Sequence, residues 1–242
     1  MSYLIEIATT DYASTLSAIK GGADRIELCS ALSEGGLTPS HGLIAQCLHD
    51  FDITLFPIIR PRSGDFLYSQ KEFDIIQADV QLCKKLGCQG IVTGFLTADG
   101  NIDIARTNTI TELAYPMKVT FHRAFDRCAD PAKALEDIIK GGCTRLLTSG
   151  QKPKAPQGSK LIKQLIELAN GRIIVMPGSG VRPHNIKELA EQTGATEFHS
   201  SLRTLKKSNM NFIHPDFAAF EEDYCHDSVN CGEVKALVAA LK

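Results

Sequence analysis

The feature that most constrains the fold is an alternation of short apolar segments with longer amphipathic ones. Helical patterns cover residues 72–86, 131–140, 160–169 and 183–192. Strands that alternate with helices form a parallel sheet, and eight strands at this spacing favour a closed barrel over an open sheet. The sequence therefore predicts an α/β fold, a single (β/α)8 TIM barrel over residues 1–242. The expected strands cover residues 3–8, 25–28, 53–59, 90–94, 118–122, 145–148, 172–176 and 196–199.

An internal repeat supports the barrel. The stretch AIKGGADRIELCS resembles DIIKGGCTRLLTSG, and KKLGCQGIVTG and EQTGATEFHSS are looser copies. Each copy is a helix end, a glycine suited to a left-handed helix terminus, and a strand. The copies precede the second, fourth, sixth and eighth strands, so four double βα units are expected.

Two features depart from this regularity. Pro57 predicts a bulge or a short third strand, and residues 200–242 form a less regular segment with a closing helix at 234–241.

Composition narrows the possible partners and the location. The net charge of −2 gives no electrostatic basis for binding nucleic acid or an anionic membrane, and the apolar runs are shorter than a membrane span. The first residues lack the basic and apolar regions of a signal peptide, so we expect a cytoplasmic protein. The eight cysteines form no CxxC pair, which argues against a structural zinc site and favours reduced, mostly buried thiols.

Polar residues interrupt the apolar strands mostly at their carboxyl ends. In a barrel the outward strand face meets helices, so these residues point inward or lie at the rim, where barrel active sites form. Inward charges need partners of opposite charge. We therefore expect Glu6 and Glu27 to form ion pairs with Arg60, Arg62 or Arg123. A structural ion network in the barrel mouth is the alternative interpretation. The catalytic candidates are Glu6, Glu27, Arg60, His122 and His199.

Two loops suggest an anion site. RPRSGDFLYS follows the third strand and carries arginines, whose planar forks suit carboxylate or phosphate. MPGSGV follows the seventh strand, a common position for phosphate sites in barrels, and backbone amides at a helix start favour anions. A solvated surface turn and a simple tight turn are the alternatives. The anion-binding candidates are Arg62, Arg123, Ser149, Gly178 and Gly180.

Cys29 is the metal candidate. It ends the second strand and can face the site, where a thiolate would suit Cu(I), a soft ion that prefers sulfur. The alternative is an inert buried thiol, because no second cysteine is evidently placed beside it.

The motifs together resemble those of a known family. GGADRIELCSALSEGGLTPS, IRPRSGDFLYS, VTFHRAFD, LLTSG, VMPGSGV and ATEFHSSLR are similar to CutC motifs, in the same order, over residues 21–203. The resemblance to the CutC copper homeostasis family implies a TIM barrel, a cytoplasmic location, a role in copper homeostasis and a homo-oligomer, often a dimer. It also implies cysteines near the ends of the first two strands as Cu(I) ligands. Cys29 matches the second position, but Ala8 stands at the first.

Two functions follow from these observations. The first is a copper-handling protein that binds Cu(I) through Cys29. The second is an enzyme that acts on a small anionic metabolite, such as a phosphorylated one, at the carboxyl end of the barrel, with Glu27 and His122 moving protons. The inward glutamates, arginines and histidines favour the enzyme, because arginines repel cations and Cu(I) prefers sulfur.

Overall fold

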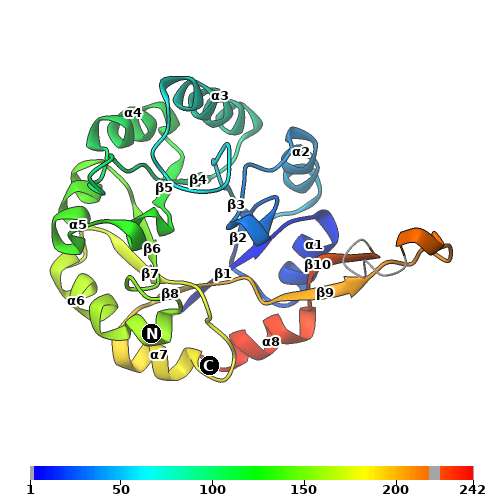
Figure 1. The fold of residues 1–242 in the computed structure, drawn as a ribbon. Coiled ribbons are helices and arrows are strands. Elements are labelled where there is room, and N and C mark those ends of the chain that lie inside the picture. Colours follow the sequence, from blue (N-terminus) through cyan, green and yellow to red (C-terminus); the bar gives the residue numbers. More distant parts are fainter. Residues whose placement is uncertain (1–2, 218–223, 242) are drawn as a thin grey trace.

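Eight parallel strands surrounded by helices form the barrel (Figure 1). The structure is a computed structural model that describes residues 3–217 and 224–241. The barrel strands are β1 (Leu4–Thr9), β2 (Arg25–Leu28), β3 (Thr54–Pro57), β4 (Gly90–Thr93), β5 (Lys118–Phe121), β6 (Arg145–Thr148), β7 (Ile174–Pro177) and β8 (Glu197–Ser200). This is the α/β TIM-barrel fold that the alternating pattern predicts.

The strands pair in two four-stranded halves. One half has the order β3-β2-β1-β8 and the other β4-β5-β6-β7. A parallel bridge between Ile58 and Val92 joins β3 to β4, where the Ile59 amide donates to the Val92 carbonyl at 2.7 Å. At the second junction, β7 and β8 lie in contact. Within the first half, Glu6 of β1 is in register with both Arg25 of β2 and His199 of β8, which places these three side chains on neighbouring strands.

Helices cover the outside of the ring, and local sequence explains their ends. Ser69 and Glu72 form a capping box at the start of α3, and Gly87 ends this helix in the left-handed conformation. An apolar core of buried strand and helix residues fills the space between the helices and the barrel. The helices are α1 (Tyr12–Lys20), α2 (His41–Asp50), α3 (Gln70–Leu86), α4 (Ile104–Ala114), α5 (Pro131–Lys140), α6 (Ser159–Ala169), α7 (Ile186–Thr193) and α8 (Cys231–Ala239), with short 3₁₀ helices η1 (Leu32–Glu34), η2 (Arg123–Arg127), η3 (Ala155–Gly158) and η4 (Pro215–Phe217).

The structure differs from the sequence prediction in a few elements. The third strand stops at Pro57, two residues before its expected end, which agrees with the predicted short strand. The closing helix begins earlier than expected, because the Asn230 side chain accepts the amides of Gly232 and Glu233 and so caps a helix starting at Cys231. After the barrel, β9 (Arg203–Lys207) and β10 (Cys225–Val229) form an antiparallel pair that projects from the ring (Figure 1). No helix in the described parts of the chain is long and apolar enough to cross a membrane.

Candidate functional site

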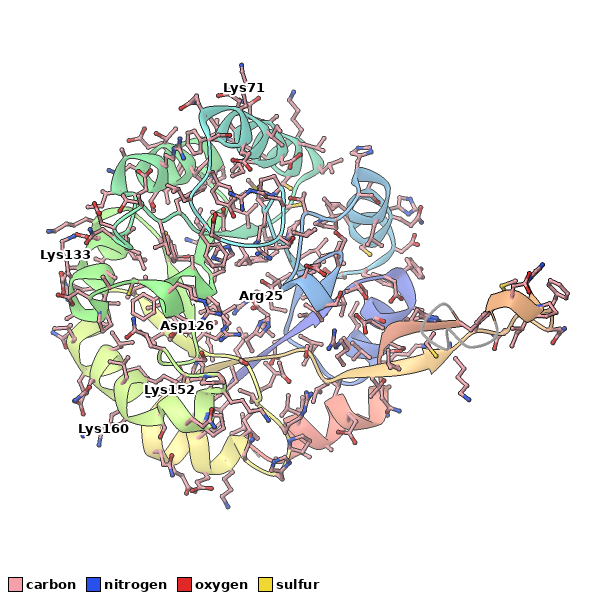
Figure 2. The ribbon with its side chains drawn as sticks, viewed as in Figure 1. Arg25, Lys71, Asp126, Lys133, Lys152 and Lys160 are labelled. Atoms are coloured by element: carbon pink, nitrogen blue, oxygen red, sulfur yellow. The ribbon has the colours of Figure 1, made fainter. Side chains whose placement is uncertain are left out.

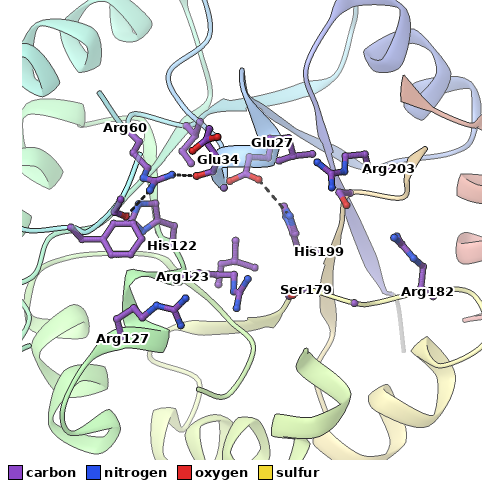
Figure 3. Close-up of a pocket in the computed structure, with 18 residues that line it drawn as sticks. Glu27, Glu34, Arg60, His122, Arg123, Arg127, Ser179, Arg182, His199 and Arg203 are labelled. Atoms are coloured by element: carbon purple, nitrogen blue, oxygen red, sulfur yellow. Dashed lines mark hydrogen bonds and ion pairs between the residues drawn. The ribbon is translucent and has the colours of Figure 1, made fainter. Parts of the chain in front are cut away.

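A cavity of about 570 Å³ opens at the carboxyl ends of the barrel strands (Figure 3). Its size lies in the range of small-molecule sites. Five arginines and two glutamates contribute to its walls, so a positive charge predominates. The charged and histidine side chains around it are Glu27, Glu34, Arg60, Arg123, Arg127, Arg182, Arg203, His122 and His199.

A buried chain of proton-carrying groups lies at the base of the cavity. His199 contacts Glu6 through Nδ1 at 2.8 Å and Glu27 through Nε2 at 3.5 Å. Glu27 and His199 line the cavity, whereas Glu6 is buried beneath them. The imidazole is therefore fixed between two carboxylates, and of these two Glu27 lines the cavity.

The pKa values of Glu6, Glu27 and His199 are shifted in different directions. Burial alone would raise the pKa of Glu6, but the hydrogen bond with His199 and the charge of Arg25 outweigh it and lower the pKa to about 2. Burial raises the pKa of Glu27 to about 7, although the charge of His199 opposes this rise. Burial would lower the pKa of His199, but the charge of Glu27 and the hydrogen bond with Glu6 raise it. Glu27, which lines the cavity, therefore exchanges a proton near neutral pH.

The buried glutamates do not pair with the arginines that the sequence suggested. The partner of Glu6 is Arg25, which also donates to Glu197 at 2.6 Å, and Arg145 donates to the same Glu197 oxygen at 2.6 Å. Arg25, Arg145 and Glu197 are the first residues of β2, β6 and β8, so the ion network lies at the amino ends of these strands. Figure 2 shows Arg25 near the middle of the ring. The sequence interpretation missed Arg25 because it considered the carboxyl ends of the strands.

His122 occupies a separate part of the cavity wall. It follows β5, and its Nδ1 accepts the backbone amide of Ala124 at 3.2 Å. Burial and the charge of Arg60 lower its pKa to about 3, so the imidazole is neutral near pH 7. The histidine that contacts Glu27 is His199, and the proton-moving role expected for His122 stays a prediction.

The two arginines after β3 have different surroundings, because Arg60 lines the cavity and Arg62 does not. Arg60 lines the cavity, with its terminal nitrogens donating to the carbonyls of Glu34, Gly36 and Gly64 at 2.7–3.0 Å. Arg62 does not line this cavity, because it is held by ion pairs with Glu72 of α3 and with Asp65. Asp65 and the capping glutamate Glu72 lie within ten residues of Arg62 and attract it away from the barrel mouth.

Ser149 is also absent from the cavity wall. Its backbone amide and hydroxyl donate to Asp126, and the hydroxyl accepts from Arg123 at 2.9 Å. Arg123 does line the cavity, and it is positioned by an ion pair with Asp126 at 2.7 Å. Ser149 therefore orients Arg123 and has no hydrogen-bonding group left for a ligand anion.

The two glycines after β7 also differ in whether they line the cavity. The Gly178 amide donates to the Thr148 carbonyl at 2.9 Å, so it is not available to an anion. A Cβ at Gly178 would lie 2.4 Å from Leu147 Cδ1 and 3.2 Å from His199 Cβ, so glycine makes room there for Leu147 and His199. Gly180, in contrast, lines the cavity beside Ser179.

Cys29 lies behind the cavity wall. Its side chain is 0% exposed and packs in a small apolar cluster with Ala8, Phe56, Ile58 and Val92. Burial, together with the charge of Glu27, raises the pKa of the thiol well above its usual range. Ala8 thus occupies the neighbouring position where the CutC resemblance implies a cysteine. All eight cysteines are free, and the described residues contain no group of three or more His, Cys, Asp or Glu side chains that could hold a metal ion.

Three cavity arginines were missed by the sequence interpretation. Arg127 ends η2, Arg182 precedes α7, and Arg203 begins β9. Arg203 pairs with Asp227 at 3.5 Å, whereas no acidic side chain in residues 3–217 or 224–241 pairs with Arg127 or Arg182. The signal that could have found Arg182 is its place after the GSG turn, where the amide-based anion site was expected.

Comparisons with known proteins agree with this architecture. The model of the CutC family matches residues 3–204. The family protein CutC of Chromobacterium violaceum is 48% identical over 244 residues, covering 100% of this chain and 99% of the relative. The copper homeostasis protein cutC homolog of Homo sapiens is 48% identical over 216 residues, covering 89% and 79%. The crystal structure of CutC from Streptococcus agalactiae has a TM-score of 0.78 and 32% identity, covering 82% of this chain and 98% of that one.

Proposed function

The chain belongs to the CutC family, and from this premise we propose that it has a role in copper homeostasis and that its cavity is the active site of an enzyme for a small anionic metabolite. The names of the human and mouse relatives support the broad role. The enzymatic proposal rests on the cavity itself. The reaction class is acid–base catalysis, with Glu27 as the group that takes and returns the proton.

The observation that carries this proposal is the position of a proton-exchanging carboxyl among arginines that lack counterions. Glu27 is 4% exposed and has its pKa near neutrality, which suits a general base. Arg127 and Arg182 line the same cavity without an acidic partner in the described chain, and the hydrogen bonds of the Arg60 guanidinium in that part of the chain go to carbonyls and not to a carboxylate. An anionic ligand would supply the missing negative charge, and phosphate matches guanidinium geometry.

Thermal unfolding with a panel of inorganic phosphate, sulfate and phosphorylated metabolites tests the anion site. A ligand at one hundred times its dissociation constant stabilises the fold by about 2.7 kcal/mol, which is visible as a rise in Tm. We expect Arg127→Gln and Arg182→Gln each to weaken binding about threefold to tenfold, because each removes a charge-assisted contact. Arg172→Gln is the matched control, since Arg172 pairs with Glu136 on the outer surface. An absent response in the wild type, or equal binding by all three variants, would contradict the proposal.

Copper binding is proposed only as a weak, secondary property of Cys29. A single thiol with a raised pKa is a poor Cu(I) ligand, because the metal binds the thiolate and prefers two or more sulfurs. In competition with a Cu(I) chelator, we expect low affinity that falls further in Cys29→Ala. The matched control is Cys225→Ala, which changes a partly exposed thiol on β10. Binding that survives Cys29→Ala and is lost in Cys225→Ala would contradict this assignment.

A further inference from the structure

His122 carries a hydrogen-bond donor for which residues 3–217 and 224–241 provide no acceptor. The Ala124 amide donates to Nδ1, so the neutral ring holds its proton on Nε2. His122 is 5% exposed, and Nε2 has no hydrogen-bond partner in the described chain. Buried polar atoms are rarely left unsatisfied, and an exception in a cavity wall suggests that a ligand completes the bond.

The ring is held rigidly in this orientation. The edge of Phe66 packs on it, with ring centroids 4.9 Å apart, and Phe121 flanks it at 6.2 Å. Gly94 allows the close approach of strand β4, because a Cβ there would lie 2.6 Å from Nδ1. A donor fixed before the ligand arrives needs no reorganisation during a reaction, which is the property of groups that stabilise a developing oxyanion.

Arg60 adds a positive field to this part of the cavity. Its guanidinium lies over the ring of Phe66, which also packs against His122, with Cζ 5.1 Å from the ring centroid. Three carbonyls hold it and no carboxylate of the described chain pairs with it, so its charge is not neutralised locally. Burial and the same charge keep His122 neutral, and a neutral imidazole is the form that donates a hydrogen bond to a carbonyl in known proton-transfer enzymes.

We propose that His122 Nε2–H binds a carbonyl oxygen of the anionic substrate, and that the enzyme removes a proton from the carbon beside that carbonyl. This deepens the proposed function and depends on it. Glu27 takes the proton, the electron pair of the broken C–H bond forms the C=C bond, and the carbonyl π electrons move to oxygen to give an enolate. His122 and Arg60 stabilise the enolate, and Glu27 then returns the proton to carbon. The substrate class is a phosphorylated or otherwise anionic ketone or aldehyde, and no co-reactant is required.

A matched pair of ligands separates the anion site from His122. Hydroxyacetone phosphate and n-propyl phosphate share a phosphate and a three-carbon chain, but only the first has a carbonyl. We expect the wild type to bind the ketone about threefold to tenfold more tightly, the value of one hydrogen bond from a buried donor. His122→Phe should lose this preference while keeping its affinity for n-propyl phosphate, and His122→Gln, which retains a donor, should keep part of it.

The outcomes distinguish the two proposals. If neither phosphate binds, the proposed function fails and this inference fails with it. If both bind equally to the wild type, or if His122→Phe keeps the preference, the His122 assignment alone is wrong. Deuterium exchange into the methylene of hydroxyacetone phosphate in D₂O, followed by NMR, tests the proton step. We expect exchange that disappears in Glu27→Gln; a wild-type rate equal to that of Glu27→Gln would overturn this step.

Discussion

Glu27 makes the stability of the protein depend on pH. Its pKa is about 7 in the folded chain and near 4.5 when unfolded. Below pH 4.5 the group is protonated in both states, whereas between pH 4.5 and 7 it ionises first in the unfolded chain. A carboxyl with a raised pKa therefore stabilises the fold at low pH and loses this contribution as the pH rises through 7. His199 acts in the same direction, because Glu27 raises its pKa as well.

We therefore expect Glu27→Gln to gain stability relative to the wild type as the pH increases. The gain between pH 4 and pH 8 should be about 3 kcal/mol, since each unit of pKa shift corresponds to about 1.4 kcal/mol. Urea unfolding at several pH values measures the difference, with Glu112→Gln on the exposed face of α4 as the control. A difference between Glu27→Gln and wild type that stays constant over this range would show that the carboxyl does not titrate as described.

At the level of single residues, polarity in an apolar strand was an informative signal. It identified Glu27, Arg60, His122 and His199, which the structure brings together around one cavity, and Glu6, which lies beneath it. The signal could not identify partners, because the sequence does not state which inward side chains share a level of the barrel. Register decides this: Glu6 is beside Arg25 and His199 across neighbouring strands, and so does not reach the loop arginines.

At the level of elements, the periodicity of apolar residues predicted the positions of the strands and helices that pack against the core. The strands and α3, α5 and α6 lie close to their expected positions because each buries an apolar face against the common core. The β9 and β10 pair was not predicted, since β9 is exposed at every position and so carries no alternating pattern. The conformations of the irregular loops between strands and helices could not be predicted from the sequence either.

The η2 segment illustrates why such connections carry the site. Asp126 in this single turn accepts the Thr148 hydroxyl at 2.6 Å and the backbone amides of Ser149 and Gln151. It thereby fixes the loop after β6 and, through the 2.7 Å ion pair, the guanidinium of Arg123. One buried carboxylate thus positions both the cavity residue Arg123 and the loop after β6, and its contacts with this loop join residues more than twenty positions apart in the sequence.

At the level of the whole molecule, the two ends of the barrel differ in character. The carboxyl ends carry the open cavity, and the amino ends carry the ion network of Arg25, Arg145 and Glu197. This division matches the general separation of function and stability between the two ends of TIM barrels. The cytoplasmic location and the homodimer stay predictions. The segment that begins with β9 and projects from the ring exposes four large apolar side chains, which a partner subunit could cover in such a homodimer. They are Leu205, Met210, Phe212 and Ile213.

The ion network also connects the two halves of the sheet. Glu197 begins β8 in the first half, whereas Arg145 begins β6 in the second. Arg145 donates through Nε and a terminal nitrogen to both Glu197 oxygens, at 2.6 and 3.2 Å. The bidentate pair therefore spans the β7/β8 junction, and Arg25 attaches β2 to the same carboxylate.

Removal of Glu197 should consequently weaken the closure of the barrel. In Glu197→Ala, both buried arginines lose a carboxylate partner, and we expect the free energy of unfolding to fall by about 3–5 kcal/mol. Glu136→Ala, which breaks the exposed pair with Arg172, should cost less than about 1 kcal/mol. Urea unfolding at low and high ionic strength measures both. Salt should reduce only the Glu136 effect, because a buried pair is little screened. Equal costs for the two variants would mean that the network at the amino ends does not hold the halves together.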